Sequence, residues 1–455
     1  DRLPVRNVIL WTSLIAGYFE HSCGKESLNC YEHMQIEGVS PSVVTFISIL
    51  KACASIGSMH EIQEIHADIE RRGLFESDVV LGSSLVDIYA KNGFLYKAQQ
   101  VFDMLPIRNV VSWTSLVGGY VEYGQGLKAL LCYEEMQIEG VFPTPLSLVC
   151  CLRACCSEGD LKKGREIHAK IEKWGIFEDD PFISSMLVNM YAKCSTLPEA
   201  RQIFNKMKSR NQVSWNVLLA GYAEHFHTEG TLECFRQMQL EGVAPNDITY
   251  ITMLKACRSI GMPHIGQQIH DDIERCGLER DLAIGSTLVS MYAECGMLVK
   301  AEQALDKLPL RNAASWNPLI MGYAEHGSGE EALKCVERMR VEGVSQDGVT
   351  CIGSFTACGN MGSANKGREI HAEAERKGFL ESETSVGNAL IHMYGKSHSQ
   401  DKAQKVFDKL QNRNIVSWTT LMAGYVQVGE SESVFCIFDR MISECIQPDP
   451  ITFVV

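Results

Sequence analysis

A tryptophan returns about every hundred residues along this chain, in the same sequence context each time. Five tryptophans stand at steps of 102, 102, 101 and 102 residues: Trp11, Trp113, Trp215, Trp316 and Trp418. A histidine and a tyrosine repeat at nearly the same steps: His66, His168, His270 and His371, then Tyr89, Tyr191, Tyr292 and Tyr394. Self-similarity at a fixed period is the signature of a repeat architecture, so one long unit is copied about four times.

The composition fits a folded array. No linker rich in Gly, Ser or Pro interrupts the period of the 455 residues, which indicates one continuous array. Hydrophobic residues make up 45% and charged residues 22%, enough to bury a long core. No run approaches the ~18 apolar residues of a membrane span. The net charge of −14 argues against a partner held by bulk electrostatics, so if the partner is a nucleic acid, individual side chains must select it.

Repeated cysteines, histidines and aromatic residues are predicted to pack the core. Four of the 18 cysteines recur at one helix position and are expected to be small buried thiols: Cys53, Cys155, Cys257 and Cys358. The repeated histidine follows an Ile in the middle of a helical stretch, which favours a packed structural histidine. No nucleophile–base set, phosphate loop or metal-ligand spacing stands apart from the repeat. We therefore expect no catalytic residue, no metal and no cofactor.

The chain begins without Met and inside a repeat. Its pair Arg6-Asn7 matches four later pairs: Arg108-Asn109, Arg210-Asn211, Arg311-Asn312 and Arg413-Asn414. We therefore expect a fragment of a longer protein, with any targeting peptide before residue 1 and any further domain after Val455.

Each hundred-residue unit divides into three segments, which we name the Trp-type, His-type and Tyr-type repeats. In the Trp-type repeat 212–246, apolar residues recur at i, i+3, i+4 and i+7, as on one face of a helix: Trp215, Leu218, Leu219 and Tyr222. A second helical stretch ends at Gly242, where a left-handed C-cap is expected. Three other copies repeat this stop: Gly38, Gly140 and Gly343. Cys445 stands there in the last copy, where we expect a weaker cap.

All three repeat types divide into two helical stretches. The Trp-type repeats are predicted at 8–42, 110–144, 212–246, 313–347 and 415–449. The His-type repeats are predicted at 43–78, 145–180, 247–281 and 348–383, and the Tyr-type repeats at 79–109, 181–211, 282–312 and 384–414, with partial repeats at 1–7 and 450–455. Each helix pair exposes an apolar face that only its neighbours can cover, so the pairs must stack. The sequence therefore predicts an all-α solenoid superhelix of helix-turn-helix repeats.

Three sets of motifs resemble those of a known family. They are SWNVLLAGYAEH (214–225) with MQLEGVAPN (238–246), LKACRSIG with GQQIHDDIERCGLERD (254–281), and STLVSMYAECG with KLPLRN (286–312). In this alternation the whole chain resembles the PLS-class pentatricopeptide repeat (PPR) proteins. The resemblance implies a right-handed superhelix, a location in the mitochondrion or chloroplast of a land plant, and binding of single-stranded RNA with one nucleotide per repeat. It further implies selection of C-to-U editing sites, with editing-complex proteins on the His-type repeats.

In that family the fifth and the last residue of a repeat read the base. Carried over, the pairs in Trp-type repeats are Thr12/Ser42, Thr114/Thr144, Asn216/Asn246, Asn317/Asp347 and Thr419/Asp449. In Tyr-type repeats they are Ser83/Asn109, Ser185/Asn211, Ser286/Asn312 and Asn388/Asn414. An Asp accepts from the imino N–H of guanine or uracil, whereas an Asn amide donates to the bare ring nitrogen of adenine or cytosine. The resemblance implies a purine where the fifth residue is Thr or Ser, and a pyrimidine where it is Asn.

The His-type repeats carry aliphatic residues at the fifth position, which form no such hydrogen bond: Ile47, Val149, Ile251 and Ile352. Each of these repeats is expected to pass one nucleotide with little discrimination. With the protein N-terminus toward the RNA 5′ end, as the resemblance implies, the predicted site is 5′-R-n-A-R-n-A-Y-n-A-U-n-Y-G-3′, where R is a purine, Y a pyrimidine and n any base. Both R positions are weak, because Ser42 and Thr144 depart from the Asn/Asp pattern.

The resemblance also implies residues that flank the bases and contact the phosphates. The base-flanking residues would be Ile9, Val80, Val111, Val213 and Val416, while Ala283, Ala314 and Ser385 are smaller and should hold their bases more loosely. The phosphate-facing residues would be Lys91, Lys193 and Lys396, but Glu294 interrupts the series. Because these charges are sparse, we expect moderate affinity with a shallow dependence on salt.

Other functions remain open on the sequence alone. An array of this kind also serves RNA stabilisation or splicing, and helical-hairpin arrays of the tetratricopeptide type bind proteins, although those repeats run 34 residues without triple alternation. The chain itself is not expected to be an enzyme. No H-x-E segment is followed by the P-C-x-x-C of the zinc deaminases, so any deaminase would lie outside residues 1–455.

Overall fold

The computed structural model describes residues 7–176 and 180–454, and the predicted partial-repeat residues 1–6 and 455 lie outside them. Within the described residues the regular elements are helices and no strand occurs, which confirms the all-α prediction. The helices group into two compact units, the first ending at Gly221 and the second beginning at Tyr222.

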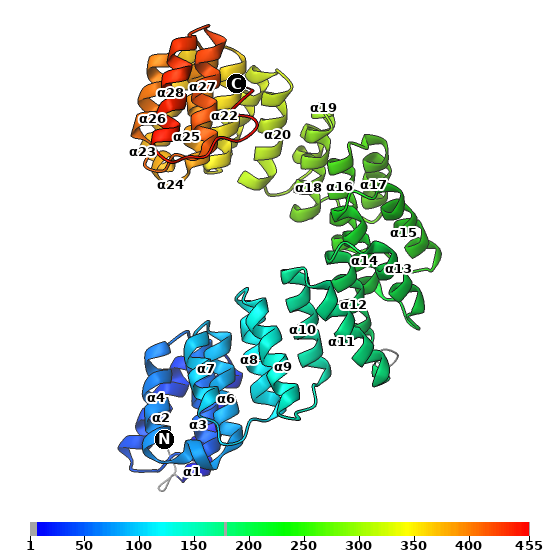
Figure 1. Cartoon of the computed structure of the whole chain (residues 1–455), viewed down its shortest axis with the longest axis vertical. Coiled ribbons are helices and arrows are strands. Elements are labelled where there is room, and N and C mark those ends of the chain that lie inside the picture. Colours follow the sequence, from blue (N-terminus) through cyan, green and yellow to red (C-terminus); the bar gives the residue numbers. More distant parts are fainter. Residues whose placement is uncertain (1–6, 177–179, 455) are drawn as a thin grey trace. The chain divides into compact units, whose positions relative to one another are not determined.

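Helix pairs make up both units (Figure 1). The first unit contains α1 (Val8–Glu20), α2 (Gly24–Ile36), α3 (Val43–Ser55), α4 (Met59–Arg71), α5 (Leu74–Ser77), α6 (Val79–Lys91), α7 (Leu95–Asp103), α8 (Val110–Glu122), α9 (Gly126–Ile138), α10 (Pro145–Glu158), α11 (Leu161–Lys173), α12 (Pro181–Lys193), α13 (Leu197–Lys206) and most of α14 (Gln212–Glu224). The second contains α15 (Thr228–Leu240), α16 (Asp247–Ile260), α17 (Pro263–Arg275), α18 (Leu282–Glu294), α19 (Leu298–Asp306), α20 (Ala313–Glu325), α21 (Gly329–Val341), α22 (Gly348–Asn360), α23 (Ala364–Arg376), α24 (Phe379–Ser382), α25 (Thr384–Lys396), α26 (Gln400–Lys409), α27 (Ile415–Gln427) and α28 (Ser431–Ser443).

Within each unit the helices form two layers. The first helix of each pair contacts the first helices of the neighbouring pairs, in the orders α1, α3, α6, α8, α10, α12 and α16, α18, α20, α22, α25, α27. The second helix packs against its own first helix and, in most pairs, against the next first helix, as α9 does against α8 and α10. The first helices therefore make one continuous layer in each unit, so equivalent positions on successive first helices become neighbours.

The repeated tryptophans lie in the core, as predicted. Four are fully buried: Trp113, Trp215, Trp316 and Trp418. Three of them meet a phenylalanine edge-on, with ring centroids 4.5 to 4.6 Å apart: Phe102–Trp113, Phe204–Trp215 and Phe407–Trp418. Such a pair contributes ~0.5–1.5 kcal/mol beyond the burial of its area. In the remaining copy Leu305 stands in place of the phenylalanine, and the Arg338 guanidinium lies 5.3 Å from the centre of the Trp316 ring.

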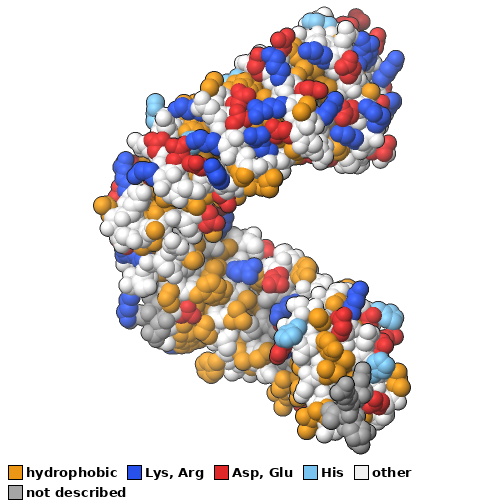
Figure 2. Space-filling model, turned by 180° about the vertical axis from the view of Figure 1, so that it is seen from behind, with side chains coloured by type: hydrophobic (Ala, Val, Ile, Leu, Met, Phe, Trp, Pro, Cys, Tyr) orange, Lys and Arg blue, Asp and Glu red, His pale blue; other side chains and the backbone are white. Residues whose placement is uncertain are grey.

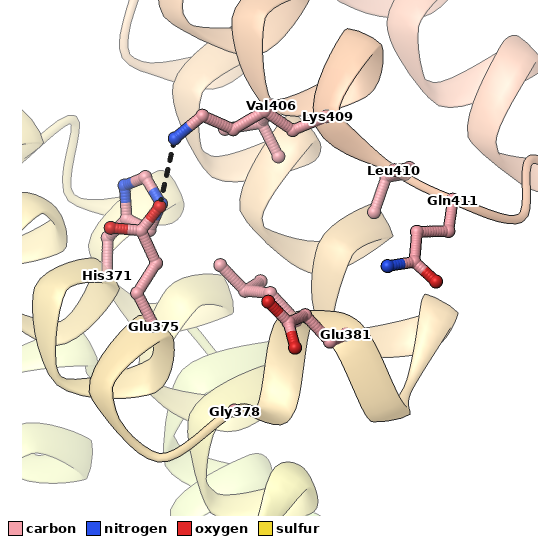
Figure 3. A pocket seen from close by; sticks show the side chains of 9 residues that line it. His371, Glu375, Gly378, Glu381, Val406, Lys409, Leu410 and Gln411 are labelled. Carbon is pink, nitrogen blue, oxygen red and sulfur yellow. Dashed lines mark hydrogen bonds and ion pairs between the residues drawn. The ribbon is translucent and has the colours of Figure 1, made fainter.

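The repeated histidines are structural, as predicted. In each copy the histidine Nδ1 lies 2.8 to 3.1 Å from a tyrosine hydroxyl: His66–Tyr89, His168–Tyr191, His270–Tyr292 and His371–Tyr394. Burial lowers the pKa of all four histidines, so the neutral ring is favoured in the fold. In the last copy Glu375 lies between His371 and Lys409, beside a cavity of about 400 Å³ (Figure 3). Each histidine–tyrosine contact therefore connects a His-type repeat to the Tyr-type repeat that follows it.

The repeated cysteines are also buried as free thiols: Cys53, Cys155, Cys257 and Cys358. Burial raises the pKa of the Cys53 thiol to about 12. These cysteines therefore fill space in the core as small apolar groups.

The second helices of the Trp-type repeats end at a residue in the left-handed backbone region. Glycine takes this conformation in four copies: Gly38 (φ 72°), Gly140 (φ 74°), Gly242 (φ 75°) and Gly343 (φ 76°). Cys445 adopts it in the last copy, with a φ of 61°. A residue with a Cβ is strained there by ~1–2 kcal/mol, so α28 ends in a less favourable cap than its four counterparts.

Replacing Cys445 with glycine should remove this strain. We expect Cys445→Gly to stabilise α28 by about 1 kcal/mol, because glycine adopts the left-handed region without a steric penalty. The measurement is amide hydrogen exchange of α28, which reports the local opening free energy. The reverse change, Gly343→Cys, should weaken the protection of α21 by a similar amount, and lower protection of α28 in Cys445→Gly would contradict the prediction.

Candidate functional site

The first unit has a cavity of about 700 Å³ along its layer of first helices. Residues from α6, from α8 and from the start of α10 contribute to its wall. Four of them are predicted base-reading residues from two successive repeats: Ser83, Asn109, Thr114 and Thr144. Two predicted base-flanking residues, Val80 and Val111, line the same cavity. Six residues that the sequence places in separate segments therefore share one surface.

The other predicted reading residues lie outside this cavity but occupy the same two structural positions. One is the fifth residue of a first helix, and the other, for all but Asp449, is the residue just before the next first helix. Asn216 belongs to the first unit and Asn246 to the second.

An exposed apolar side chain marks the second residue of most first helices. The predicted flanking residues are 51 to 70% exposed: Ile9, Val80, Val111, Val213 and Val416. The sequence analysis missed Phe182 in a Tyr-type repeat, and it missed four residues of the His-type repeats that are 47 to 60% exposed: Val44, Leu146, Ile248 and Val349. Register alone could have found them, because each is the second residue of its repeat. The His-type repeats thus present the same apolar edge as the others.

Every predicted last-position residue accepts a hydrogen bond from the backbone N–H three residues further on. The side-chain oxygen to nitrogen distances are 2.8 to 3.3 Å for Ser42, Asn109, Thr144, Asn211, Asn246, Asn312, Asp347, Asn414 and Asp449. For all but Asp449 that N–H lies in the first turn of the next first helix, so the side chain is its N-cap. The capping hydrogen bond uses one side-chain oxygen. Asn109 can then offer a ligand its Nδ2, which is a donor, whereas an Asp can still offer its second oxygen, which is an acceptor.

Most fifth-position hydroxyls donate to the backbone of their own helix. The oxygen-to-oxygen distances to the carbonyl four residues earlier are 2.6 to 3.1 Å for Ser83, Thr114, Ser185, Ser286 and Thr419. Thr12 differs, because its hydroxyl lies 2.6 Å from that of Thr45. A hydroxyl whose proton is used in this way meets a ligand mainly as an acceptor.

In repeats 313–347 and 384–414, an asparagine at the fifth position contacts the last residue of the repeat. Asn317 Nδ2 donates to both carboxylate oxygens of Asp347, at 3.0 and 3.1 Å, and Thr350 Oγ1 lies 2.7 Å from Asn317 Oδ1. Burial by itself would raise the pKa of Asp347, but hydrogen bonds from Thr350 and Asn317 outweigh it and lower that pKa. The carboxyl group is therefore an acceptor at neutral pH. In the other repeat, Asn388 Nδ2 lies 3.3 Å from Asn414 Oδ1.

The predicted phosphate-facing lysines are partly engaged within the chain. Lys91 Nζ lies 2.8 Å from a carboxylate oxygen of Asp87, which itself lines the cavity, and Lys396 donates to Asn360 at 2.8 Å. Lys193 is exposed at the end of α12. On the face drawn in Figure 2, the Lys and Arg side chains of the second unit lie among Asp and Glu and do not gather into one basic patch. Lys51 of α3 is the only Lys or Arg among the residues that line the cavity of the first unit.

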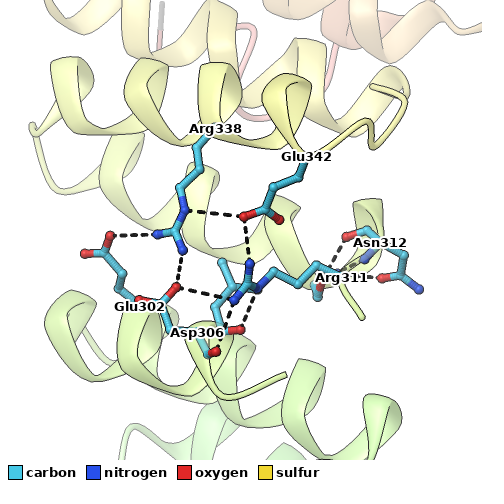
Figure 4. A network of polar contacts seen from close by, with 8 residues as sticks. Glu302, Asp306, Arg311, Asn312, Arg338 and Glu342 are labelled. Atoms are coloured by element: carbon cyan, nitrogen blue, oxygen red, sulfur yellow. Dashed lines mark hydrogen bonds and ion pairs between the residues drawn. The ribbon is translucent and has the colours of Figure 1, made fainter. Parts of the chain in front are cut away.

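An arginine precedes each last-position asparagine of the Tyr-type repeats and holds it in place. Arg311 donates to the backbone carbonyls of Leu305 and Asp306, at 2.9 and 3.0 Å, and to the Glu342 carboxylate at 2.6 Å (Figure 4). Arg108, Arg210 and Arg413 also bond carbonyls at the end of the preceding helix. The carbonyls of Phe204, Leu305 and Phe407 also accept from the backbone N–H three residues further on, at 3.1 to 3.2 Å. The arginine therefore adds a second hydrogen bond at the end of the helix that precedes the asparagine.

No group of three or more His, Cys, Asp or Glu side chains in the described part of the chain is arranged to hold a metal ion. Among the same residues, every helix is too short or too polar to cross a bilayer.

Two family descriptions match the chain along most of its length. The PPR repeat family matches residues 6–55, 210–259 and 413–455. The PPR repeat matches residues 83–110, 111–141, 147–176, 182–212 and 314–344.

Relatives in Arabidopsis thaliana carry the same repeat. A chloroplastic pentatricopeptide repeat-containing protein is 31% identical over 454 residues, which is 100% of this chain and 73% of the relative. A second chloroplastic protein of that description is 31% identical over 94% of this chain and 53% of its own length. A mitochondrial one is 30% identical over 98% of this chain and 43% of its own length. The chain thus spans only part of the length of these relatives.

Solved structures share the fold. The maize pentatricopeptide repeat protein PPR10 aligns with a TM-score of 0.66 at 17% identity, covering 99% of this chain and 70% of that protein. The same protein in complex with an 18-nucleotide psaJ RNA element aligns with a TM-score of 0.56 at 14% identity, covering 100% and 81%. Both identities are low, so these alignments concern the stacking of helix pairs. Together with the matched repeats and the relatives, they show that the chain belongs to the pentatricopeptide repeat family.

Proposed function

We propose that this chain binds single-stranded RNA in a sequence-specific manner, with one nucleotide per repeat, and that it selects C-to-U editing sites in a chloroplast or mitochondrion. The fifth and last residues of the Trp-type and Tyr-type repeats read the bases in this proposal. The residue at the second position of each repeat, which is apolar in every repeat except 384–414 with Ser385, lies between successive bases. The proposed class is the PLS class, because three repeat types alternate along the chain.

The observation that supports RNA binding most directly is the cavity formed by α6, α8 and the start of α10. Val80 and Val111 are 61% and 55% exposed on two successive first helices, so their apolar side chains offer a base something to stack on. Polar groups of two reading pairs lie beside them: Ser83 with Asn109, and Thr114 with Thr144. Apolar edges alternating with polar groups suit unpaired bases, whose faces are apolar and whose edges form hydrogen bonds.

The base that a repeat prefers depends on which side-chain atom of its last residue is not used in the capping hydrogen bond. Asn312 Oδ1 is held by the Ser315 N–H, so Nδ2 donates to the ring nitrogen of adenine, which bears no hydrogen. Asp449 Oδ1 is held by the Thr452 N–H, so Oδ2 accepts from the imino N–H of guanine. The bound RNA of the maize protein supports single-stranded RNA as the ligand class.

The names of the relatives support the cellular location. Curated relatives at 30 to 31% identity are described as chloroplastic or mitochondrial. Both organelles are therefore candidates for this chain, and editing-complex proteins on the His-type repeats remain part of the proposal.

Binding to a designed RNA tests the proposed function as a whole. We expect the chain to bind an RNA with the series 5′-R-n-A-R-n-A-Y-n-A-U-n-Y-G-3′ at least about tenfold more tightly than a scrambled RNA of equal composition, because each matched hydrogen bond contributes ~1 kcal/mol. Fluorescence anisotropy with labelled RNAs gives both dissociation constants. Equal affinity for the two RNAs, or no affinity for either, would favour a protein-binding scaffold.

A single substitution tests the hydrogen-bond logic at one nucleotide. Asn312→Asp should keep the cap on the Ser315 N–H while replacing the outward donor with an acceptor. We expect the preferred base at the nucleotide of repeat 282–312 to change from adenine to guanine, with a change in the affinity ratio of about tenfold or more. As a matched control, Asn109→Asp should alter only the nucleotide of repeat 79–109. An adenine preference that survives Asn312→Asp argues against base reading by this residue.

The salt dependence tests how many phosphates the chain neutralises. Three sparse lysines predict that the logarithm of the binding constant falls with the logarithm of salt concentration at a slope no steeper than about −2, since each neutralised phosphate of a single strand contributes ~0.7. Lys396→Gln should make the slope shallower by about 0.7, whereas Lys405→Gln, on the second helix α26, should leave it unchanged. A wild-type slope near that of a strongly basic RNA-binding protein would rule out this picture.

A further inference from the structure

A buried hydroxyl lies three residues after each last-position residue of the Trp-type and Tyr-type repeats. These hydroxyl residues are at most 5% exposed: Thr45, Ser112, Ser147, Ser214, Thr249, Ser315, Thr350, Ser417 and Thr452. Three residues after the end of each His-type repeat, the chain has an apolar residue instead: Leu81, Ile183, Ile284 and Val386. The buried hydroxyl therefore occurs three residues after each last-position residue that is proposed to read a base, and it does not occur three residues after the last residue of a His-type repeat.

We propose that Ser417 is a positioning residue for base selection, because it holds the Asn414 amide with the oxygen turned inward and the nitrogen turned toward the nucleotide. This inference rests on the proposed function and concerns how one of its reading residues is kept in a single orientation. An asparagine amide has a donor end and an acceptor end, so its orientation decides which base edge it can recognise.

Three donors converge on the oxygen of Asn414. They are the Ser417 backbone N–H at 3.0 Å, the Ser417 hydroxyl at 3.0 Å and Asn388 Nδ2 at 3.3 Å. Rotating the Asn414 amide by half a turn would bring its own NH₂ group against these three donors. Rotating Asn388 instead would aim a carbonyl oxygen at Asn414 Oδ1. The two amides and the hydroxyl therefore fix one another's orientation, and Asn414 presents Nδ2 to a ligand.

Asp347 occupies the same environment but has a different chemical symmetry. Its Oδ1 is contacted by the Thr350 backbone N–H at 2.9 Å, the Thr350 hydroxyl at 2.9 Å and Asn317 Nδ2 at 3.0 Å. The two oxygens of a carboxylate are equivalent, so half a turn of Asp347 presents the same acceptor as before. The Thr350 hydroxyl also lies 2.7 Å from Asn317 Oδ1, but Asn317 is held in its orientation without that contact, because its Nδ2 donates to both carboxylate oxygens of Asp347. Loss of the buried hydroxyl should thus affect base choice at Asn414 and not at Asp347.

The two sites form a matched pair for an experiment with the full chain. Ser417→Ala and Thr350→Val each delete one buried hydroxyl and leave the backbone N–H of the cap in place. At the pyrimidine of repeat 384–414, Asn414 Nδ2 should favour cytosine, whose ring nitrogen bears no hydrogen, over uracil. We expect Ser417→Ala to reduce this preference by about three- to tenfold, because the rotated amide accepts from the uracil imino N–H. Thr350→Val should leave the preference for uracil over cytosine at the nucleotide of repeat 313–347 unchanged, even if both variants melt at a lower temperature.

A conservative variant separates orientation from general damage to the helix. Ser417→Thr should keep the wild-type preference, since threonine holds this place beside Asn246 and Asp347. The inference is overturned if Ser417→Ala keeps the wild-type ratio of cytosine to uracil affinity, or if Thr350→Val loses its ratio to the same extent. Wild-type protein that binds neither RNA would overturn the proposed function, and this inference with it.

Discussion

The first turn of each first helix has backbone N–H groups with no partner inside the helix, and something must satisfy them. In every described first helix except α25, where Glu383 makes no such bond, a Ser, Thr, Asn or Asp at the end of the preceding repeat does so, from Ser42 to Asp347 and Asn414. After one side-chain oxygen has accepted the capping hydrogen bond, these residue types differ in the group left for a ligand. An Asn presents the donor Nδ2, whereas an Asp presents a second oxygen, which is an acceptor. A single structural requirement thus places polar side chains along the layer of first helices, and the choice among them sets what each repeat offers to a ligand.

The regular spacing of those caps depends on the packing behind them. Edge-on pairs such as Phe102–Trp113 and Phe407–Trp418 join one repeat to the next, and the histidine–tyrosine contacts join His-type to Tyr-type repeats. Where Leu305 interrupts the aromatic series, Arg338 covers Trp316 and also contacts Glu302 and Glu342. The stack therefore keeps its geometry by different contacts in different copies, as expected when each repeat is stabilised mainly by its neighbours.

The charge of the chain is consistent with selection by individual side chains. A net charge of −14 gives no general attraction for a polyanion, and Lys91 is paired with Asp87 beside the cavity. Discrimination in the proposed function thus relies on directed hydrogen bonds and on apolar edges such as Val80, Val111 and Leu146. In the proposed function, the exposed aliphatic residues of the His-type repeats allow these repeats to hold a nucleotide by stacking, although they lack a polar fifth residue.

The sequence by itself determined the helix pairs, the glycine stops such as Gly343, and the burial of residues such as Trp316 and Cys358, because periodicity and propensity are local properties. It also placed Ser83, Asn109, Thr114 and Thr144 in equivalent positions of their repeats. Only the tertiary structure decided which end of the Asn317 and Asn388 amides is held, and that those four residues line one cavity. Those outcomes depend on contacts between residues about 30 positions apart, such as Asn317 with Asp347, and such contacts exist only after the repeats have stacked.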